Sequence, residues 1–555
     1  MRWGVALIGL AAVIAVSIAI VALSTGKPSV SPAIGYMPAT TIQYTEVRLD
    51  LPGDQRSKLA AVLAPFPGFN DQSQIQPKLN DVLDRIVRAA TKDKMTYTAD
   101  IQPWFNGQLA FGMTAPSAAE QSAPAAVTAM GAAIPLGVVG ITDQAKATAW
   151  LKGVASGQVD ETTYNGVSLY TFGGGNSTGS AVAVTDKVML VGTMQAVKAA
   201  VDSKGQGKLA EDADFKAALN ELDRDYVFLS VQKIKGFVDS MLVTMNGSSN
   251  ALARTQMDET IVAMLPAWQL TSIRFDDNAL VGTSVQPPFK IGYDGANRKG
   301  TLAGHLPAST LVYGEVHDVG PAVKAMIDKF RALPEAADAF RQFDQAMAIV
   351  GGFDASIGWL GDVGFAIAKD ANGVIGGGLV VQPRDAAAAE RLVTMFRGLL
   401  QFGGASSGLT MRDEDHNGTK VTVINVAGVP SASTLPAGYK TEFAFAVRDD
   451  VVVIGYGLNF VTDVLDAGPG KSLADSARFK SLMSKLGEEN MGASFVDLDG
   501  IRLGLEPILK QFAKPDQWAT YEREIRPYLE HLDVLASVTR KDGGTDRVVQ
   551  QLTTH

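Results

Sequence analysis

The chain has 555 residues, of which 46% are hydrophobic and 19% charged, with a net charge of −9 and no cysteine. This length favours two domains, and this composition excludes a wholly disordered chain. The acidic net charge argues against a nucleic-acid surface, and the lack of cysteine excludes disulfides, thiol catalysis and cysteine-bound metals.

The N-terminus predicts a membrane anchor over residues 1–24. An apolar run from Trp3 to Leu23 follows Arg2 without a charge or a proline. About 20 helical residues cross the hydrocarbon core of a bilayer, whereas the apolar part of a cleaved signal peptide spans about 7–15. We therefore expect an uncleaved, single-pass anchor in a bacterial cytoplasmic membrane, with the bulk of the chain extracytoplasmic. Cleavage of the segment as a signal peptide is the alternative.

The exported part contains an internal duplication. Leu209–Leu222 (LAEDADFKAALNEL) and Leu473–Leu486 (LADSARFKSLMSKL) match, with Asp212 and Ser476 at the same place before an apolar pattern of helical spacing. Aspartate and serine at that place predict helix N-caps. Other matched landmarks, at similar spacing, are the prolines that open each copy, a tryptophan before a strand, and Asn-Gly turns.

The duplication predicts the domain plan. After a linker at 25–34, we expect a first repeat at 35–290, a linker at 291–304 and a second repeat at 305–555. Alternating strands joined by Asn-Gly and Asp-Gly turns favour antiparallel pairing. The expected fold class is therefore α+β, with two tandem homologous domains, each a mostly antiparallel sheet covered by helices, after one transmembrane helix.

Each repeat opens with a proline followed by a strand. In Tyr36–Asp50 the side chains of Ile42, Tyr44, Glu46 and Arg48 share one face of that strand. The corresponding segment of the second repeat is His305–Val319, in which Glu315 stands at the place of Glu46. Further N-caps are expected at Asp143 and Asp385, each before a helix.

These features resemble a known family. The strand openings Pro38-Ala39 and Pro307-Ala308, the segments that begin at Trp104 and Trp359, and the single N-terminal span are similar to a bacterial family of exported, membrane-anchored proteins. That family is known only as a domain of unknown function. The resemblance implies no activity, cofactor or catalytic residue. Trp104 and Trp359 each precede an apolar strand, so we expect both in the core.

Two catalytic patterns lack their required context. AGPGKS, Ala467–Ser472, resembles a phosphate-binding loop, but Leu465 stands where that loop needs glycine and a helix precedes it. Gly-x-Ser-x-Gly occurs around Ser177 and Ser406, but neither lies between a strand and a helix as a nucleophile elbow requires. We expect connecting loops at all three places.

One metal candidate exists. Asp413, Asp415, Asn417 and Gly418 match positions 1, 3, 5 and 6 of a calcium loop. The acid expected at position 12 is Ile424. We therefore expect an acidic hairpin turn here, with a weak calcium site at Asp413, Asp415 and Asn417 as the alternative. No other cofactor is predicted.

The leading functional hypothesis is a non-enzymatic, membrane-anchored binding or scaffold protein of the cell envelope. Its partner would be an envelope protein, a polymer or an apolar ligand, besides the membrane that the N-terminal helix enters; nucleic acid is not expected. One alternative is a hydrolase or metal-dependent enzyme with a site assembled from distant loops. The other is a mechanical spacer or a subunit of an envelope complex.

Overall fold

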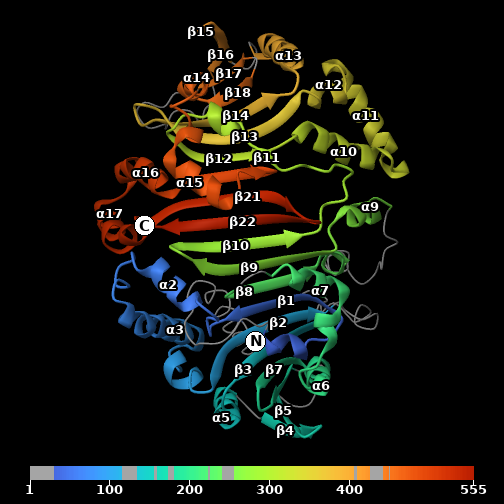
Figure 1. The fold of residues 1–555 in the computed structure, drawn as a ribbon, viewed down its shortest axis with the longest axis vertical. Coiled ribbons are helices and arrows are strands. Elements are labelled where there is room, and N and C mark those ends of the chain that lie inside the picture. Colours follow the sequence, from blue (N-terminus) through green and yellow to red (C-terminus); the bar gives the residue numbers. More distant parts are fainter. Residues whose placement is uncertain are drawn as a thin grey trace. The chain divides into compact units, whose positions relative to one another are not determined.

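The computed structural model describes residues 31–114, 134–155, 159–172, 180–222, 225–239, 256–404, 409–425, 442–448 and 450–555. The chain divides into two compact units (Figure 1). Unit 1 comprises Met1–Ala253 and Leu265–Pro288, and unit 2 comprises Arg254–Met264 and Phe289–His555. No helix within the described ranges is long and apolar enough to cross a bilayer. The anchor predicted at 1–24 lies outside these ranges.

Unit 1 is built on antiparallel strands that pair in the order β4–β5–β6–β7–β3–β2–β1–β8–β9–β10. The strands are β1 (Thr41–Arg48), β2 (Phe105–Thr114), β3 (Ile134–Ile141), β4 (Val159–Tyr164), β5 (Val167–Phe172), β6 (Ser180–Val184), β7 (Val188–Thr193), β8 (Phe228–Lys233), β9 (Trp268–Asp276) and β10 (Ala279–Gln286). The helices are η1 (Pro32–Tyr36), α2 (Gln55–Leu63), η2 (Gln72–Gln74), α3 (Ile75–Thr91), η3 (Tyr97–Ile101), α5 (Gln144–Val154), α6 (Met194–Ser203), η4 (Lys208–Glu211) and α7 (Ala213–Asn220).

Unit 2 repeats this plan. Its main strands, also antiparallel, pair in the order β15–β16–β17–β18–β14–β13–β12–β20–β21–β22. They are β12 (Thr310–Val316), β13 (Leu360–Lys369), β14 (Ile375–Pro383), β15 (Thr410–His416), β16 (Thr419–Asn425), β17 (Glu442–Arg448), β18 (Val451–Tyr456), β20 (Gly492–Asp497), β21 (Leu532–Asp542) and β22 (Thr545–Thr554). Taken in chain order, each strand therefore has the same neighbours as its counterpart in unit 1.

The remaining elements of unit 2 surround this sheet. They are α9 (Gln256–Met264), β11 (Arg298–Lys299), η5 (Leu302–His305), α10 (Val319–Arg331), η6 (Pro334–Ala336), α11 (Ala337–Met347), η7 (Ala348–Val350), α12 (Phe353–Ile357), α13 (Ala386–Gly404), α14 (Leu458–Asp466), η10 (Leu473–Asp475), α15 (Ala477–Leu486), β19 (Glu489–Asn490), α16 (Leu498–Phe512), α17 (Pro515–Thr520), η11 (Tyr521–Ile525) and α18 (Arg526–Leu529). Strand β11 pairs with β19, so the segment predicted as a linker at 291–304 is partly strand. Its glycine-rich sequence carries no periodicity that would reveal two strand residues.

Local chemistry explains the matched strand openings. The backbone amide and the hydroxyl of Thr41 both donate to the carbonyl oxygen of Pro38, at 3.0 and 2.7 Å. Thr310 donates to Pro307 in the same way and at the same distances. A hydroxyl that supplements a backbone turn bond fixes the entry into a strand. The strand register then shifts at Thr41 and at Thr310, as a bulge in each unit.

The predicted caps are confirmed. The Asp212 carboxylate accepts from the amides of Asp214 and Phe215, and the Ser476 hydroxyl accepts from the amide of Phe479. Asp143 and Asp385 cap α5 and α13, accepting from amides three residues on. These side chains satisfy N–H groups that have no partner inside a helix.

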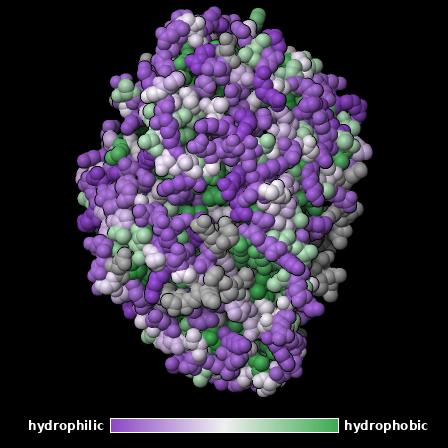
Figure 2. Space-filling model, in the orientation of Figure 1, coloured by the Kyte–Doolittle hydropathy of each residue, from purple (hydrophilic) through white to green (hydrophobic). Residues whose placement is uncertain are grey.

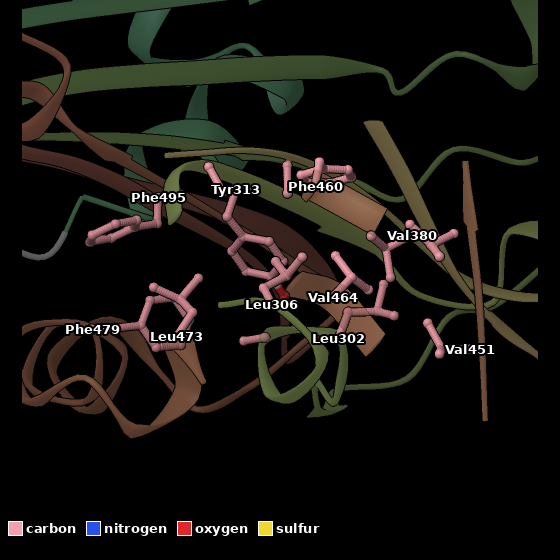
Figure 3. Packing of buried hydrophobic residues seen from close by; sticks show 14 of the residues in the cluster. Leu302, Leu306, Tyr313, Val380, Val451, Phe460, Val464, Leu473, Phe479 and Phe495 are labelled. Atoms are coloured by element: carbon pink, nitrogen blue, oxygen red, sulfur yellow. The ribbon is translucent and has the colours of Figure 1, made fainter. Parts of the chain in front are cut away.

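We call the sheet face that carries Tyr44 and Tyr313 the inner face. In unit 1 it is buried by η1, η4, α6 and α7, and in unit 2 by η5, η10, α14 and α15. Figure 3 shows Tyr313 among side chains of this second core, including Leu306, Phe460 and Phe495. The opposite, outer face is packed differently in the two units.

Candidate functional site

A buried polar cluster lies on the inner face of unit 1. The Tyr44 hydroxyl donates to the Glu46 carboxylate at 2.6 Å, and a guanidinium nitrogen of Arg48 lies 3.7 Å from the other oxygen, Oε1. Arg48 also forms two bonds to Asp50, at 2.7 and 2.6 Å. Tyr226 completes the group and is buried with it. Glu46 itself is 0% exposed.

Burial dominates the electrostatics of this cluster. It raises the pKa of Glu46 from 4.5 to about 7, although the Tyr44 hydrogen bond and Arg48 favour the charged form. Burial and the neighbouring Glu46 charge also raise the pKa of Tyr44 and of Tyr226. Neutral Glu46 is therefore a substantial species near neutral pH.

Unit 2 has a related cluster at the same place. The Glu315 carboxylate lies 3.2 Å from the His317 imidazole, and these side chains are 4% and 3% exposed. Tyr313 is buried beside them, and burial with the Glu315 charge raises its pKa. Arg298 of β11 forms an ion pair with the buried Asp362. The cation thus comes from β11, whereas in unit 1 it comes from the central strand itself.

The strand register shows which side chains correspond. Glu46 pairs with Ala110, and Glu315 with Gly364, so Asp362 takes the place of Gln108. Gln108 also belongs to the first cluster, because its amide donates to Asp50 at 3.0 Å. In the second cluster His317 replaces Arg48, and Arg298 supplies the positive charge instead.

The Glu315–His317 pair is an acid–histidine pair, a type that an enzyme could use. Substrate has no access to it, however, because both side chains lie almost wholly inside the protein. A Cβ atom added to Gly300 would lie 1.7 Å from Glu315 Oε1, so the backbone of this glycine closes directly over the carboxylate. The clusters therefore act as buried polar centres of each unit.

The outer face differs most between the units. In unit 2 it carries large apolar side chains that remain exposed: Val316 (59%), Phe365 (45%), Leu379 (47%), Ile454 (45%) and Phe443 (44%). Phe365 pairs with Leu379, and Leu379 pairs with Ile454, so three of them lie side by side on β13, β14 and β18. We call these five residues the outer apolar face. The side of the molecule seen in Figure 2 is mainly hydrophilic with small apolar patches.

In unit 1 the same face is a core. Val47 follows Glu46 as Val316 follows Glu315, yet Val47 is 2% exposed. Helix α3 buries Ile75, Leu79, Leu83 and Val87 in that core, at a spacing of four residues. Further members come from η3, α2 and α5. Among the described residues of unit 2, the buried cluster on the outer face consists of Val381, Ala389 and Val452.

Helix α13 borders the outer apolar face, and the calcium candidate holds it there. Arg397 of α13 forms an ion pair with Asp413 of β15, which also accepts from the Thr422 hydroxyl at 3.0 Å. Phe396 of α13 packs edge-on against Phe445, with ring centroids 6.4 Å apart. Asp413 therefore ties the helix to the edge of the sheet.

The other calcium candidates lie in the hairpin turn. Asp415 accepts from the Gly418 amide at 3.1 Å, and the Asn417 side chain donates to Asp466 at 3.1 Å. Asn417 and Gly418 have φ of 53° and 80°, as a tight two-residue hairpin requires. No cluster of three or more His, Asp or Glu residues suited to a metal ion occurs in the described ranges. The calcium site stays a prediction.

The remaining motifs have structural explanations. In the loop Ala467–Ser472 the Asp475 carboxylate accepts from the Gly470 amide at 2.7 Å and from the Ser472 hydroxyl at 2.8 Å. The Gly470 amide and the Ser472 hydroxyl are thus already bonded to a carboxylate of the same chain. Ser177 and Ser406 lie outside the described residues.

The prediction that both matched tryptophans lie in the core is confirmed for Trp104, whereas Trp359 is only partly buried. Trp104 is buried in the outer core of unit 1, and Trp359 packs against the smaller outer cluster of unit 2. Their indole nitrogens donate to the carbonyls of Asp100 and Ser356, at 2.7 and 2.9 Å. Both side chains are therefore used inside the fold.

Sequence reasoning missed both the polar clusters and the outer apolar face. A signal for the clusters was present, because an acid stands at the same place of the same apolar strand in both repeats, as Glu46 and Glu315. The outer apolar face had no such signal, since its residues follow the same alternating pattern as those of a covered face.

Comparison with known proteins identifies the family. Solved structures of TP0453 in crystal forms IV and III are similar at 11% and 9% identity, covering 48% and 49% of this chain and 83% and 90% of theirs, each with a TM-score of 0.23. No curated protein matches the sequence significantly. The family model described as "Protein of unknown function (DUF3352)" matches residues 4–547. The chain therefore belongs to the DUF3352 family.

Proposed function

We propose that this chain is a membrane-anchored, extracytoplasmic, non-enzymatic binding protein. Its two units are tandem homologous domains, and unit 2 binds a hydrocarbon chain of a membrane lipid on its outer apolar face. The shared strand order, the matched Pro-x-x-Thr turns and the matched helix caps support the duplication. The apolar run Trp3–Leu23 supports the anchor. The observation that carries the binding function is the contrast between buried Val47 and exposed Val316.

The chemistry of the outer apolar face favours hydrocarbon over other ligands. Its five side chains offer no hydrogen-bonding group, and the hydroxyl of neighbouring Thr422 already donates to Asp413. Neighbouring strands are about 4.8 Å apart, so Phe365, Leu379 and Ile454 form a row about 10 Å wide. Apolar residues that are contiguous and exposed mark binding sites. A slender acyl chain fits a row of this width, and an anchored protein works next to a supply of acyl chains.

The enzyme alternative receives less support. The buried acid–histidine pair Glu315–His317 is closed to substrate. His416 and Asp466 are closer to solvent and lie 2.8 Å apart, but Asn417 shares the same Asp466 oxygen, as in a structural turn.

Photochemical labelling tests the binding function. The full chain is incorporated into vesicles of phosphatidylethanolamine and phosphatidylglycerol that contain a phospholipid with a diazirine in one acyl chain. After illumination, mass spectrometry maps the adducts. We expect adducts on β13, β14 and β18 and none on their unit 1 counterparts β2, β3 and β7, whose outer face is covered. Equal labelling of both sets, or labelling of neither, would overturn the proposal.

A variant pair sharpens this test. Leu379→Arg places a charge in the middle of the outer apolar face, and an unpaired charge against hydrocarbon is costly, so labelling should fall about tenfold or more. Asn372→Arg changes the exposed hairpin turn between the same strands and should label as the natural chain does. N-terminal sequencing of the membrane fraction tests the anchor, because a mature chain that begins near Thr25 would contradict it.

A further inference from the structure

In chain order, helix α11 of unit 2 corresponds to helix α3 of unit 1. Each lies between the first two strands of its unit, β1 and β2 or β12 and β13. Helix α3 contributes four buried residues to the outer core of its unit, whereas α11 has no buried residue. Its sequence is nevertheless amphipathic, with Phe340, Phe343 and Met347 three and four residues apart. The apolar stripe of α11 is therefore not buried against the sheet as the stripe of α3 is.

A small aromatic cluster holds α11 in the position that the structure shows. The Arg331 guanidinium lies over the rings of Phe340 and Phe353, 5.7 and 5.0 Å from their centroids. Phe343 packs against Phe353 at 5.5 Å. Arg331 also forms an ion pair with Asp344 of α11. Cation–π contacts and a partly exposed ion pair are individually weak interactions, so this attachment can exchange.

The two ends of α11 differ: the chain is fixed before the helix and can change direction after it. Ala336 before α11 and Phe353 after it are buried, at 3% and 8% exposure, and fix the flanking chain. Gly351 and Gly352 follow the helix with φ of 86° and 92°, and a Cβ atom on Gly352 would meet nothing within 4 Å. Such a glycine pair changes backbone direction at little cost. The glycine pair therefore gives the C-terminal end of α11 a place to change direction, and buried Ala336 is the fixed point at its N-terminal end.

We propose that α11 is the cover of the outer apolar face, seen here in its open position, and that it closes over the bound acyl chain. This inference rests on the proposed function. Closure would place Phe340, Phe343 and Met347 over the ligand, as α3 places its own stripe over the outer face of unit 1. The contacts of Arg331 with Phe340 and Asp344 would break at the same time, as would the contact between Phe343 and Phe353, so Arg331 holds the open position.

Spin labels can measure the movement, because the chain has no cysteine. Gln342→Cys places one nitroxide on α11, and Thr394→Cys places the other on α13, which packs against the sheet. Pulsed dipolar spectroscopy gives their separation. The full chain is kept in amphipol, with or without palmitate. We expect palmitate to add a shorter distance. The matched pair Asp81→Cys and Ala149→Cys, on α3 and α5 of unit 1, should show one distance in both samples.

A variant of Arg331, the residue that holds the open position, separates this inference from the proposed function. Arg331→Gln should shift the labels toward the shorter distance even without palmitate. Without the Arg331 contacts, the apolar stripe of α11 is free to pack on the outer apolar face. Arg341→Gln removes an exposed arginine of the same helix, paired with Asp338, and should leave the distances unchanged.

Two outcomes are decisive. If the diazirine lipid labels β13, β14 and β18 but neither palmitate nor Arg331→Gln moves α11, the cover is refuted and the binding function stands. If Arg331→Gln closes α11 but no lipid labels the strands, the lipid proposal fails, and the closure is then an internal rearrangement without a ligand.

Discussion

Replacement of Glu46 by glutamine should stabilise the protein above neutral pH and leave it nearly unchanged in mild acid. Glu46 is fully buried, and its pKa rises from 4.5 to about 7 on folding. The folded state therefore binds a proton more tightly than the unfolded state. Below pH 4.5 the carboxyl group is protonated in both states and contributes no penalty. As pH rises from 4.5 through 7, the protein loses stability because the group must either stay protonated or ionise inside the core.

The size of the effect follows from the shift. One pKa unit corresponds to about 1.4 kcal/mol, so a rise from 4.5 to about 7 amounts to about 3 kcal/mol of lost stability at pH 8. Solvent screening does not reduce this figure, because the group has no exposure. Glutamine keeps the neutral shape and still accepts the Tyr44 hydrogen bond, so Glu46→Gln should recover most of that loss.

Urea unfolding of the full chain at pH 5, 6, 7 and 8, followed by circular dichroism, measures the difference between the two proteins. We expect the Glu46→Gln advantage to grow from about 1 kcal/mol or less at pH 5 to about 3 kcal/mol at pH 8. The control, Glu522→Gln, neutralises an exposed carboxyl group and should follow the natural profile. Parallel profiles, or a variant that is less stable at pH 8, would refute the reasoning.

Three further predictions concern matched positions. Val47→Ala should lower the free energy of unfolding in urea by about 2 kcal/mol, because it leaves a cavity in the core. Val316→Ala should lower it by less than about 0.5 kcal/mol, because Val316 is exposed. Equal losses would show that Val316 is covered. Thr310→Val removes the hydrogen bond from the Thr310 hydroxyl to the Pro307 carbonyl and should lower the free energy of unfolding by about 1 kcal/mol. Thermal unfolding measures this loss, and an unchanged melting temperature would show that the bond does not stabilise the turn. Because Asp413 is already paired with Arg397, we expect neither calcium nor a chelator to move the melting temperature, and a calcium-dependent rise would establish the calcium site.

Local signals accounted for much of each unit. Asn417-Gly418 predicts a tight turn because both residues tolerate positive φ, and the structure has that turn. Asp212 and Ser476 predict helix starts because their oxygens satisfy free amides within three residues, and both do so. The antiparallel pairing followed from the same short-range chemistry.

The buried polar clusters needed the assembled sheet. In the sequence Glu46 is one acid in an alternating strand, and only the folded chain brings Tyr226, which precedes β8, next to it. In unit 2 the positive charge near Glu315 comes from Arg298, on a two-residue strand that carries no sequence signal.

Strands, turns, caps and their repeated order could be predicted from the amino-acid sequence, because these features depend on residues a few positions apart. Tertiary structure alone decided which faces are covered. Val47 and Val316 each follow a glutamate on the first strand of a unit, yet one is 2% and the other 59% exposed. Alternation places both side chains on the outer face, but whether a helix such as α3 or α11 packs there depends on contacts between elements that no local pattern encodes.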